Sequence, residues 1–355
     1  MFTTYFNRKA APFCLLIGCA LQSGLGAEDQ ARRQPVRING TFLQLLSEHN
    51  QWPQSRWSEL FGYFQQLGLR FLILQWSVID DTAFYPSDRF KSATTSTIEA
   101  VLKEADDHGI SVRLGLIQDS DYWTRIAGDT VSVKTYLDSV RVRSLTAAQE
   151  LAKLMTGHKS LAGWYIPQEV DDVTWRDRQT REALTEGVSS IVVGLRKLTP
   201  KLTISISAFA QGQASPKGFE EFWSNFFAST KLDCVLFQDG VGVNKLQISE
   251  VPLYMSALKQ AATKAGRRAD VVVELLEQTS GPPIDEKAFH AKPATMERIE
   301  RQLKSIEQFG PEEVIGFSVP EYMTPLGGPQ AAELYERYRD YLNGSPAPAA
   351  VNKNK

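Results

Sequence analysis

The chain has very few cysteines: three in 355 residues, of which Cys14 and Cys19 lie within the first twenty positions. Only Cys234 is left for the rest of the sequence, so no disulfide framework can hold the folded domain together. The stability of the domain must therefore come from a hydrophobic core. A hydrophobic content of 43% is sufficient for such a core in an ordinary globular protein.

The sequence also lacks an excess of either charge and lacks the usual cofactor motifs. A formal net charge of -2 gives no basic surface for nucleic acid. Neither Gly-x-Gly-x-x-Gly nor Gly-x-x-x-x-Gly-Lys-Ser/Thr follows a strand-like run, which argues against nucleotide chemistry. The four histidines lack zinc-site spacing, and Asp119 and Asp121 lack the further ligands of a calcium loop. We therefore expect no metal and no cofactor, and a monomer whose partner is neutral or a small molecule.

Residues 1–27 are expected to form a leader that directs export. A positive pair at 8–9 precedes an apolar stretch at 10–21 that is too short to span a bilayer. Leu-Ile-Gly-Cys at 16–19 resembles a bacterial lipoprotein processing box, in which Cys19 would be acylated and would attach the protein to a membrane. The alternative is simple cleavage near 26–27. We expect a periplasmic or outer-membrane lipoprotein, or else a secreted protein.

Residues 38–342 alternate between short apolar runs and longer stretches with helical periodicity. The apolar runs cover 38–46, 69–77, 110–118, 161–169, 202–210, 232–242, 270–277 and 314–320. The helical stretches include 56–67, 96–108, 144–155, 178–198, 252–264, 296–309 and 330–341. Eight strands alternating with helices predict an α/β fold, a single (β/α)8 TIM barrel, better than a doubly wound sheet. Residues 28–37 are then a linker, and 343–355 a low-complexity tail that we expect to be disordered.

The residues that follow the strands of a parallel barrel meet at one rim, where such folds keep their chemistry. Pro167 is expected to stop the fourth strand, so that Gln168 and Glu169 lie just past its end. The seventh run is followed by Glu274 and Glu277, of which Glu274 directly continues the apolar segment. The other predicted rim residues are amides, carboxylates and aromatics, a mixture that suits sugar hydroxyls and sugar C–H faces: Gln44, Gln75, Trp76, Asp119, Trp123, Asp239, Glu321 and Tyr322.

Glycoside hydrolysis needs two carboxylates that flank one bond. Strands four and seven lie on opposing sides of an eight-stranded mouth, so Glu169 is the candidate general acid/base and Glu274 the candidate nucleophile or second carboxylate. The remaining rim residues, with Gln168 and Glu277, would bind the sugar. Apolar and aromatic neighbours of Glu169 would raise its pKa. Two simpler interpretations stay open: Glu169 could pair with a nearby arginine, and Asp239 could only form a turn with Gly240.

Several segments together resemble a known family. They are 40–44, 74–76, 114–116 with Asp119 and Trp123, 163–169, 238–242 and 274–277. They are similar to exported bacterial barrels that are catalogued as a domain of unknown function and described as glycoside-hydrolase-type. More distantly, an acid/base on strand four and a nucleophile on strand seven resemble the retaining barrel glycosidases, which usually have asparagine where Gln168 stands.

The sequence therefore predicts a carbohydrate-active barrel, a glycoside hydrolase acting on a polysaccharide or oligosaccharide. The alternative is a carbohydrate-binding accessory protein of polysaccharide export or surface assembly that does not catalyse a reaction. A lyase or aldolase barrel is disfavoured because no strand ends in a candidate Schiff-base lysine.

Overall fold

The computed structural model describes residues 35–92, 95–282 and 284–344. The predicted leader, Cys19, most of the linker and the end of the tail lie outside these residues. Within the described part of the chain, no helix is both long and apolar enough to cross a bilayer.

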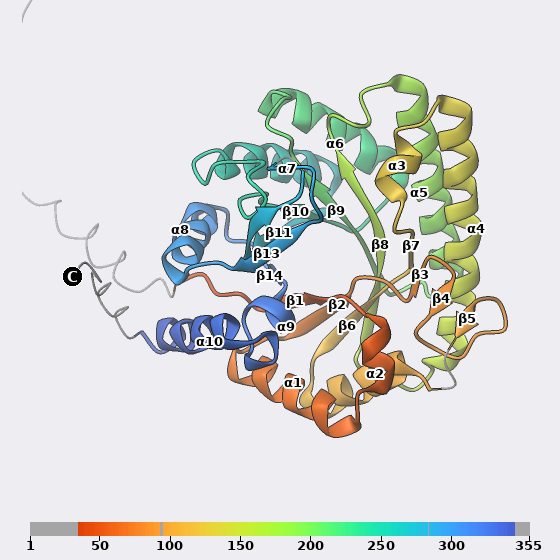
Figure 1. The fold of residues 1–355 in the computed structure, drawn as a ribbon. Helices are drawn as coiled ribbons and strands as arrows, with labels where there is room; N and C mark the ends of the chain where they lie inside the picture. The colour runs from red at the N-terminus through yellow and green to blue at the C-terminus, as the bar shows by residue number, and fades with distance from the viewer. Residues whose placement is uncertain (1–34, 93–94, 283, 345–355) are drawn as a thin grey trace, which may run out of the picture. The chain divides into compact units, whose positions relative to one another are not determined.

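Eight parallel strands close into a barrel at the centre of Figure 1. In chain order they are β1 (Gly40–Leu43), β2 (Phe71–Leu74), β6 (Ser111–Gly115), β8 (Leu161–Asp171), β9 (Thr203–Phe209), β10 (Cys234–Gln238), β11 (Arg268–Glu274) and β14 (Val314–Phe317). Strand β14 pairs with β1 and closes the ring. Each of the eight predicted runs overlaps one barrel strand, so the predicted (β/α)8 fold is confirmed.

Helices surround the strands in Figure 1. The main ones are α1 (Gln54–Gln66), α2 (Thr97–His108), α4 (Thr130–Leu154), α5 (Arg178–Leu198), α6 (Pro216–Thr230), α7 (Val251–Ala265), α8 (Met296–Ile306) and α10 (Pro329–Leu342). Shorter pieces are the helices α3 (Tyr122–Ile126) and α9 (Val319–Tyr322) and the 3-10 turns Ser47–Gln51, Glu307–Phe309 and Pro325–Gly327.

Two of these helices exceed what the sequence pattern predicted. Helix α6 was not assigned, although Ser215 caps it by accepting a hydrogen bond from the backbone N–H of Gly218, and Pro216 occupies its first turn. Helix α4 begins fourteen residues earlier than the predicted 144 because Asp129 accepts hydrogen bonds from the N–H groups of Val131 and Ser132. Local capping chemistry, more than apolar periodicity, determines where these two helices begin.

Two small sheets extend beyond the barrel. Strands β12 (Leu276–Ser280) and β13 (His290–Pro293) form an antiparallel hairpin after β11. Strands β3 (Val78–Ile79), β4 (Thr82–Ala83), β5 (Lys91–Ser92) and β7 (Ile117–Gln118) form a sheet from the segments after β2 and β6. The predicted third and seventh runs included the first residues of these sheets, 117–118 of β7 and 276–277 of β12, so each of the two runs extended past the end of its barrel strand.

The hydrophobic core has two layers. The barrel interior holds a compact cluster made of Phe42, Phe71, Ile73, Tyr165, Cys234, Leu236, Val272 and Ile315. A larger layer fills the space between strands and helices, and Trp57, Trp164 and Trp223 belong to it. The interior cluster closes the barrel from below, so chemistry is confined to the rim.

The interior cluster provides a direct test of the packing. Phe42 is 1% exposed and packs edge-on against Tyr165, with ring centroids 5.3 Å apart. We predict that Phe42→Ala lowers the free energy of unfolding by about 3–5 kcal/mol, because the barrel cannot collapse around the cavity. Denaturant unfolding followed by circular dichroism measures this change. The exposed Leu253→Ala control on α7 should stay within about 0.5 kcal/mol of the wild type, and equal losses in both variants would contradict the packing described here.

Candidate functional site

Glu169 lies on a bulge of the fourth barrel strand. The prediction that strand β8 stops at Pro167 is wrong, because the strand continues to Asp171. Its register against β9 shifts between Ile166 and Val170. A proline has no N–H to donate, so it fits into a ladder only where pairing is interrupted, as it is here. A bulge redirects the side chains near it, which explains how Glu169 can turn toward the mouth.

The side chain of Glu169 reaches across the rim toward the sixth strand. Gln238, the last residue of β10, donates a hydrogen bond from Nε2 to Glu169 Oε1 at 2.7 Å. Strand β9 lies between β8 and β10, so this bond spans it. The Tyr122 hydroxyl donates to the backbone oxygen of Glu169 at 2.7 Å and holds the bulge from the other side.

The predicted perturbation of Glu169 is confirmed in direction. Burial raises the pKa of Glu169, while the hydrogen bond from Gln238 and the charge of Lys245 act in the opposite sense. The side chain is only half-buried by surface area. Glu169 is therefore a carboxyl group that is largely surrounded by protein but remains accessible to solvent. Accessibility of this kind is required of a group that exchanges protons with a ligand.

Glu274 ends the seventh barrel strand and is 5% exposed. The backbone N–H of Val243 donates to Glu274 Oε2 at 3.0 Å. Burial raises the pKa of Glu274, and the charge of the neighbouring Asp239 raises it further. Glu277 does not belong to this site: it lies in the β12–β13 hairpin, where Lys292 Nζ approaches its carboxylate to 3.4 Å. The prediction that Glu277 binds substrate stays a prediction, and the structure places this residue in the hairpin that begins at Leu276.

The loop 239–246, which follows β10, packs onto the end of β11. Gly240 has a φ of 63°, which glycine adopts without strain and which allows the sharp turn. Gly242 lies so close to β11 that a Cβ there would be 2.3 Å from the Leu276 carbonyl oxygen and 2.9 Å from Glu274 Oε2. These contacts give the Asp-Gly-Val-Gly motif a physical role, since it brings the loop backbone against the carboxylate of Glu274.

The same loop carries Lys245 into the mouth. Its Nζ lies 3.5 Å from the ring centroid of Phe209, at the end of β9. Its positive charge lowers the pKa values of both Glu169 and Glu274, so it lies near both carboxylates. Sequence reasoning missed this residue because it lies seven positions beyond the end of β10.

Asp239 acts inside the protein rather than at its surface. It is 1% exposed, and its Oδ1 accepts hydrogen bonds from the backbone N–H groups of Glu274 and Val241, both at 3.3 Å. Gln302 of α8 donates from Nε2 to Asp239 Oδ2 at 2.6 Å. Burial raises the pKa of Asp239. The predicted sugar contact is corrected, because both carboxylate oxygens of Asp239 already bind the protein.

A second residue of α8 that the sequence did not single out supports the same strand end. Arg298 donates from Nη2 to the carbonyl oxygens of Glu274, at 2.7 Å, and Leu276, at 2.6 Å. Arg298 and Gln302 are four residues apart and so lie on one face of the helix. This spacing is the signal in the sequence that could have identified them.

Several predicted sugar ligands are engaged with the protein instead. Asp119 forms an ion pair with Arg143 at 2.8 Å and accepts a hydrogen bond from Tyr136. Gln168 is 2% exposed and donates to the carbonyl oxygen of Ile117. We correct both predictions: Asp119 fastens α4 to the rim, and Gln168 fastens the bulge to β7.

Three predicted residues form a connected wall beyond β1 and β2. Gln44 donates from Nε2 to Gln75 Oε1 at 2.8 Å. The Trp76 indole N–H donates to the carbonyl oxygen of Leu45 at 2.8 Å, and the ring is 7% exposed. The structure therefore brings these three together, although Trp76 offers little free surface for stacking on a sugar.

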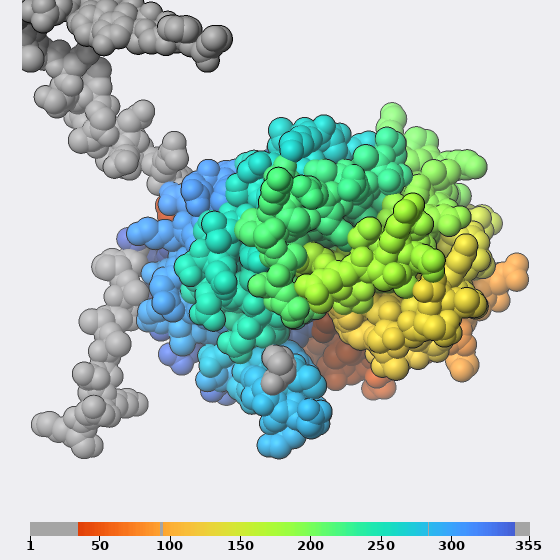
Figure 2. Space-filling model, turned by 90° about the horizontal axis from the view of Figure 1, so that it is seen from above, coloured from red at the N-terminus to blue at the C-terminus, as the bar shows by residue number. Residues whose placement is uncertain are grey.

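Trp123, by contrast, is well placed to meet a ligand. It is 42% exposed and packs against Phe209 with ring centroids 5.7 Å apart. The ammonium of Lys245 lies over the ring of Phe209, so Trp123 and Lys245 both contact this ring. Figure 2 shows the blue β12–β13 hairpin projecting at the lower edge, with a recess between it and the yellow α3–α4 region.

Glu321 and Tyr322 lie in α9, close to Glu274. The charges of Glu321 and Glu274 both raise the pKa of Tyr322, after the larger effect of burial. Burial also raises the pKa of Glu321 to about 7. Its Oε2 is buried and has no hydrogen-bond partner among the described residues. Glu321 is therefore a further buried carboxyl with a raised pKa, in the helix that follows β14.

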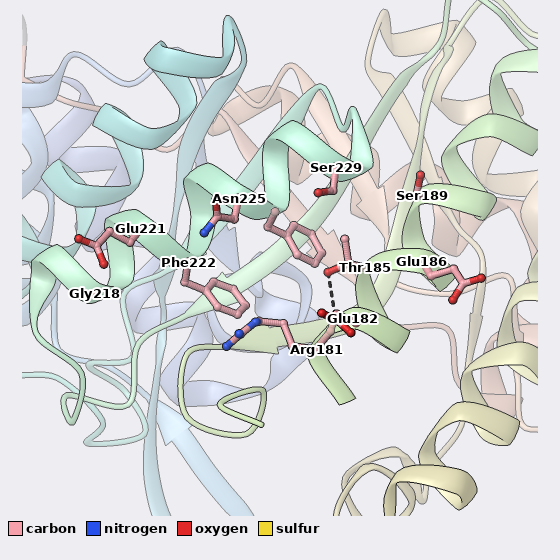
Figure 3. A pocket seen from close by; sticks show the side chains of 11 residues that line it. Arg181, Glu182, Thr185, Glu186, Ser189, Gly218, Glu221, Phe222, Asn225 and Ser229 are labelled. Atoms are coloured by element: carbon pink, nitrogen blue, oxygen red, sulfur yellow. Dashed lines mark hydrogen bonds between the residues drawn. The ribbon is translucent and has the colours of Figure 1, made fainter. Parts of the chain in front are cut away.

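A groove of about 580 Å³ lies elsewhere, between α5 and α6 (Figure 3). Its lining includes Arg181, Glu182 and Phe222 and none of the predicted rim residues. Among the described residues, no cluster of three or more His, Cys, Asp or Glu side chains could hold a metal ion. The chemistry of the described part is thus concentrated at the rim carboxylates.

The glycine contact can be tested by adding one carbon. We predict that Gly242→Ala lowers the free energy of unfolding by roughly 1–3 kcal/mol, since its Cβ would meet backbone rather than a movable side chain. Gly62→Ala in α1 is the matched control: nothing lies within 4 Å of its Cβ, so stability should rise by about 0.5–1 kcal/mol. Thermal and urea unfolding measure both. A Gly242→Ala protein as stable as the wild type would contradict the contact.

The buried carboxyl of Glu321 should make stability depend on pH. Its pKa is raised in the folded state, so the unfolded chain releases this proton first, and stability is lost as pH rises from about 4.5 toward 7. We predict that Glu321→Gln removes this loss, a gain of at most about 3 kcal/mol relative to the wild type at pH 8. Unfolding curves of the two proteins from pH 4 to 8 measure the difference, and parallel pH profiles would contradict it.

Comparison with known proteins assigns this chain to a family. The family model described as a domain of unknown function, DUF4434, matches residues 38–333. The uncharacterized protein YbcH of Escherichia coli K12 is 27% identical over 261 residues, which are 72% of this chain and 81% of that protein.

Solved structures share the fold. The crystal structure described as "a putative alpha-L-fucosidase" from Bacteroides thetaiotaomicron VPI-5482 matches with a TM-score of 0.72 and 20% identity, over 92% of this chain and 99% of that one. An endo-beta-1,4-mannanase from Thermotoga petrophila matches with a TM-score of 0.57 and 13% identity, over 89% and 79% of the two chains. These likenesses show the TIM-barrel fold. By its match over the barrel, the chain belongs to the DUF4434 family.

Proposed function

We propose that this protein hydrolyses a glycosidic bond at the rim of its barrel, with Glu169 and Glu274 as the two working carboxylates. One observation carries the proposal: carboxylates from strands four and seven come close enough to one ammonium, that of Lys245, for its charge to act on both. Hydrogen bonds connect them as well, because Gln238 binds Glu169 and the adjacent Asp239 binds the backbone of Glu274. Two carboxylates that flank one bond are the requirement for this reaction.

The environments of the two carboxylates suit different parts of the reaction. Glu169 is the proposed general acid, because its raised pKa favours the protonated form and it keeps contact with solvent. Glu274 is the proposed second carboxylate. Burial and the charge of Asp239 raise its pKa to about 8, and the N–H of Val243 and the charge of Lys245 act against that rise, so its ionised form depends on these two partners. Hydrolysis needs one protonated and one ionised group, and the rim supplies partners for both states.

Other features of the rim support a sugar as substrate. The exposed face of Trp123 can cover the C–H face of a sugar ring, and the amides of Gln44 and Gln75 can bind its hydroxyls. The fold neighbours described as a fucosidase and a mannanase are consistent with a polysaccharide or oligosaccharide. On the predicted leader, we also propose that the protein acts outside the cytoplasm, either anchored through Cys19 or secreted.

One observation favours a second candidate function. Glu274 is only 5% exposed, and a carboxylate that a substrate cannot reach would leave the barrel with binding alone. In that case the protein would be a carbohydrate-binding accessory protein of polysaccharide export or assembly. Sugar binding without any new reducing ends would favour this function.

The reaction can be tested on Glu169. We predict that Glu169→Gln lowers turnover at least about 100-fold, because a glutamine cannot donate the proton, while the affinity for sugar changes little. A screen of the purified protein against bacterial polysaccharides, scored by new reducing ends, identifies a substrate for the assay. Glu221→Gln, on the exposed surface of α6, is the matched control and should keep full activity. Unchanged turnover in Glu169→Gln would remove this residue from the mechanism.

A further inference from the structure

We propose that Lys245 is the residue that selects the substrate, and that it selects a sugar bearing a carboxylate beside the cleaved bond, a hexuronic acid. The inference rests on the proposed function, and it adds the chemical class of the substrate. It starts from the position of one ammonium group among the working carboxylates.

The position of Lys245 is determined by the protein around it. The backbone N–H of Lys245 donates to the Gly240 carbonyl oxygen at 2.9 Å, which closes the loop behind the side chain. The ammonium rests 3.5 Å from the ring centroid of Phe209, within the range of a cation–π contact. The side chain is half-buried, so the loop holds the charge inside the mouth rather than in bulk water.

The donors of this ammonium remain available. Within the described residues, Lys245 Nζ makes no hydrogen bond, and it lies beyond ion-pair distance of Glu169 and Glu274. A lysine ammonium has three N–H donors, and a half-buried ammonium needs partners for them. Phe209 offers a ring face and no acceptor, so the donors point to water or to a ligand.

The geometry of a hexuronic acid matches this arrangement. Its carboxylate is attached to C5, and C5 and the anomeric carbon are both bonded to the ring oxygen. A cation located near both working carboxylates is therefore within reach of the C5 substituent of the sugar whose bond is cleaved. Hydrogen bonds between an ammonium and a carboxylate are about twice as strong as neutral ones, which gives selectivity over the corresponding neutral sugar.

The electrostatics of Glu169 point the same way. Without substrate, the charge of Lys245 lowers the pKa of Glu169, against the requirement of a general acid. A bound carboxylate would neutralise that charge and let burial raise the pKa further. The other charged and polar groups that act on Glu169 are Asp171, which raises its pKa, and Gln238, which lowers it. Neither of them would be changed by the substrate carboxylate at Lys245.

The experiment compares acidic polysaccharides with their own neutral forms. Alginate, homogalacturonan and hyaluronan are each used as fragments, before and after chemical reduction of the carboxyl groups to primary alcohols. Isothermal titration calorimetry measures the affinity of the wild type, Lys245→Met, Lys245→Arg and Lys217→Met for each pair. Lys217, on α6, has an 84% exposed side chain and is the matched control. Circular dichroism shows whether each variant is folded.

We expect the wild type to bind at least one acidic fragment about tenfold or more tightly than its reduced form. Lys245→Met should lose this preference, Lys245→Arg should keep part of it, and Lys217→Met should keep all of it. The preference of the wild type should also weaken as salt is raised.

Binding of every reduced fragment as tightly as its acidic form, or an acidic preference unchanged in Lys245→Met, would overturn the role of Lys245 and leave the proposed function standing. Failure of every acidic and neutral fragment to bind would overturn this inference and count against the proposed function as well.

Discussion

The contact between the loop 239–246 and the end of β11 determines the geometry of the mouth. Gly242 lets the loop backbone approach the Leu276 carbonyl oxygen, and Val243 then donates to the carboxylate of Glu274. A larger residue at 242 would separate the two segments. Since Lys245 belongs to the same loop, its position depends on this contact too. One backbone packing interaction thus places both the second carboxylate and the cation.

The electrostatics of the rim follow from burial. Glu169, Asp239, Glu274 and Glu321 all have raised pKa values, and in each case burial is the largest cause. Burying carboxyl groups costs stability unless some of them hold protons or a cation compensates for their charge. Carboxyl groups that retain protons near neutral pH are suited to acid catalysis. The loss of stability caused by burying them is therefore linked to the proposed function of the site.

Much of the barrel could be predicted from the sequence because its signal is periodic. Eight apolar runs separated by helical stretches admit few other topologies, and each run overlaps a barrel strand. Glu169 and Glu274 were singled out because each follows an apolar run; Glu274 does end β11, whereas β8 continues two residues past Glu169. The start of α6 and the first half of α4 were missed because caps at Ser215 and Asp129, rather than apolar spacing, begin them.

The rest of the site depends on contacts between segments distant in sequence. Nothing local to Lys245 shows that a glycine-rich loop turns it toward β8 and β11. Asp239 was interpreted from its Asp-Gly turn, whereas its role depends on Gln302 in α8, sixty-three residues away. Asp119 likewise meets Arg143 only after α4 folds back onto the rim. Such pairings become visible only in three dimensions.

The central claim is that the carboxylates of strands four and seven act on one glycosidic bond. A crystal structure of Glu169→Gln with a bound oligosaccharide measures it most directly, through the separation between the residue 169 amide and the Glu274 carboxylate. We predict that the two groups flank one glycosidic oxygen at roughly 5–9.5 Å from each other. A sugar bound elsewhere, or a pair separated by much more than this, would contradict the claim.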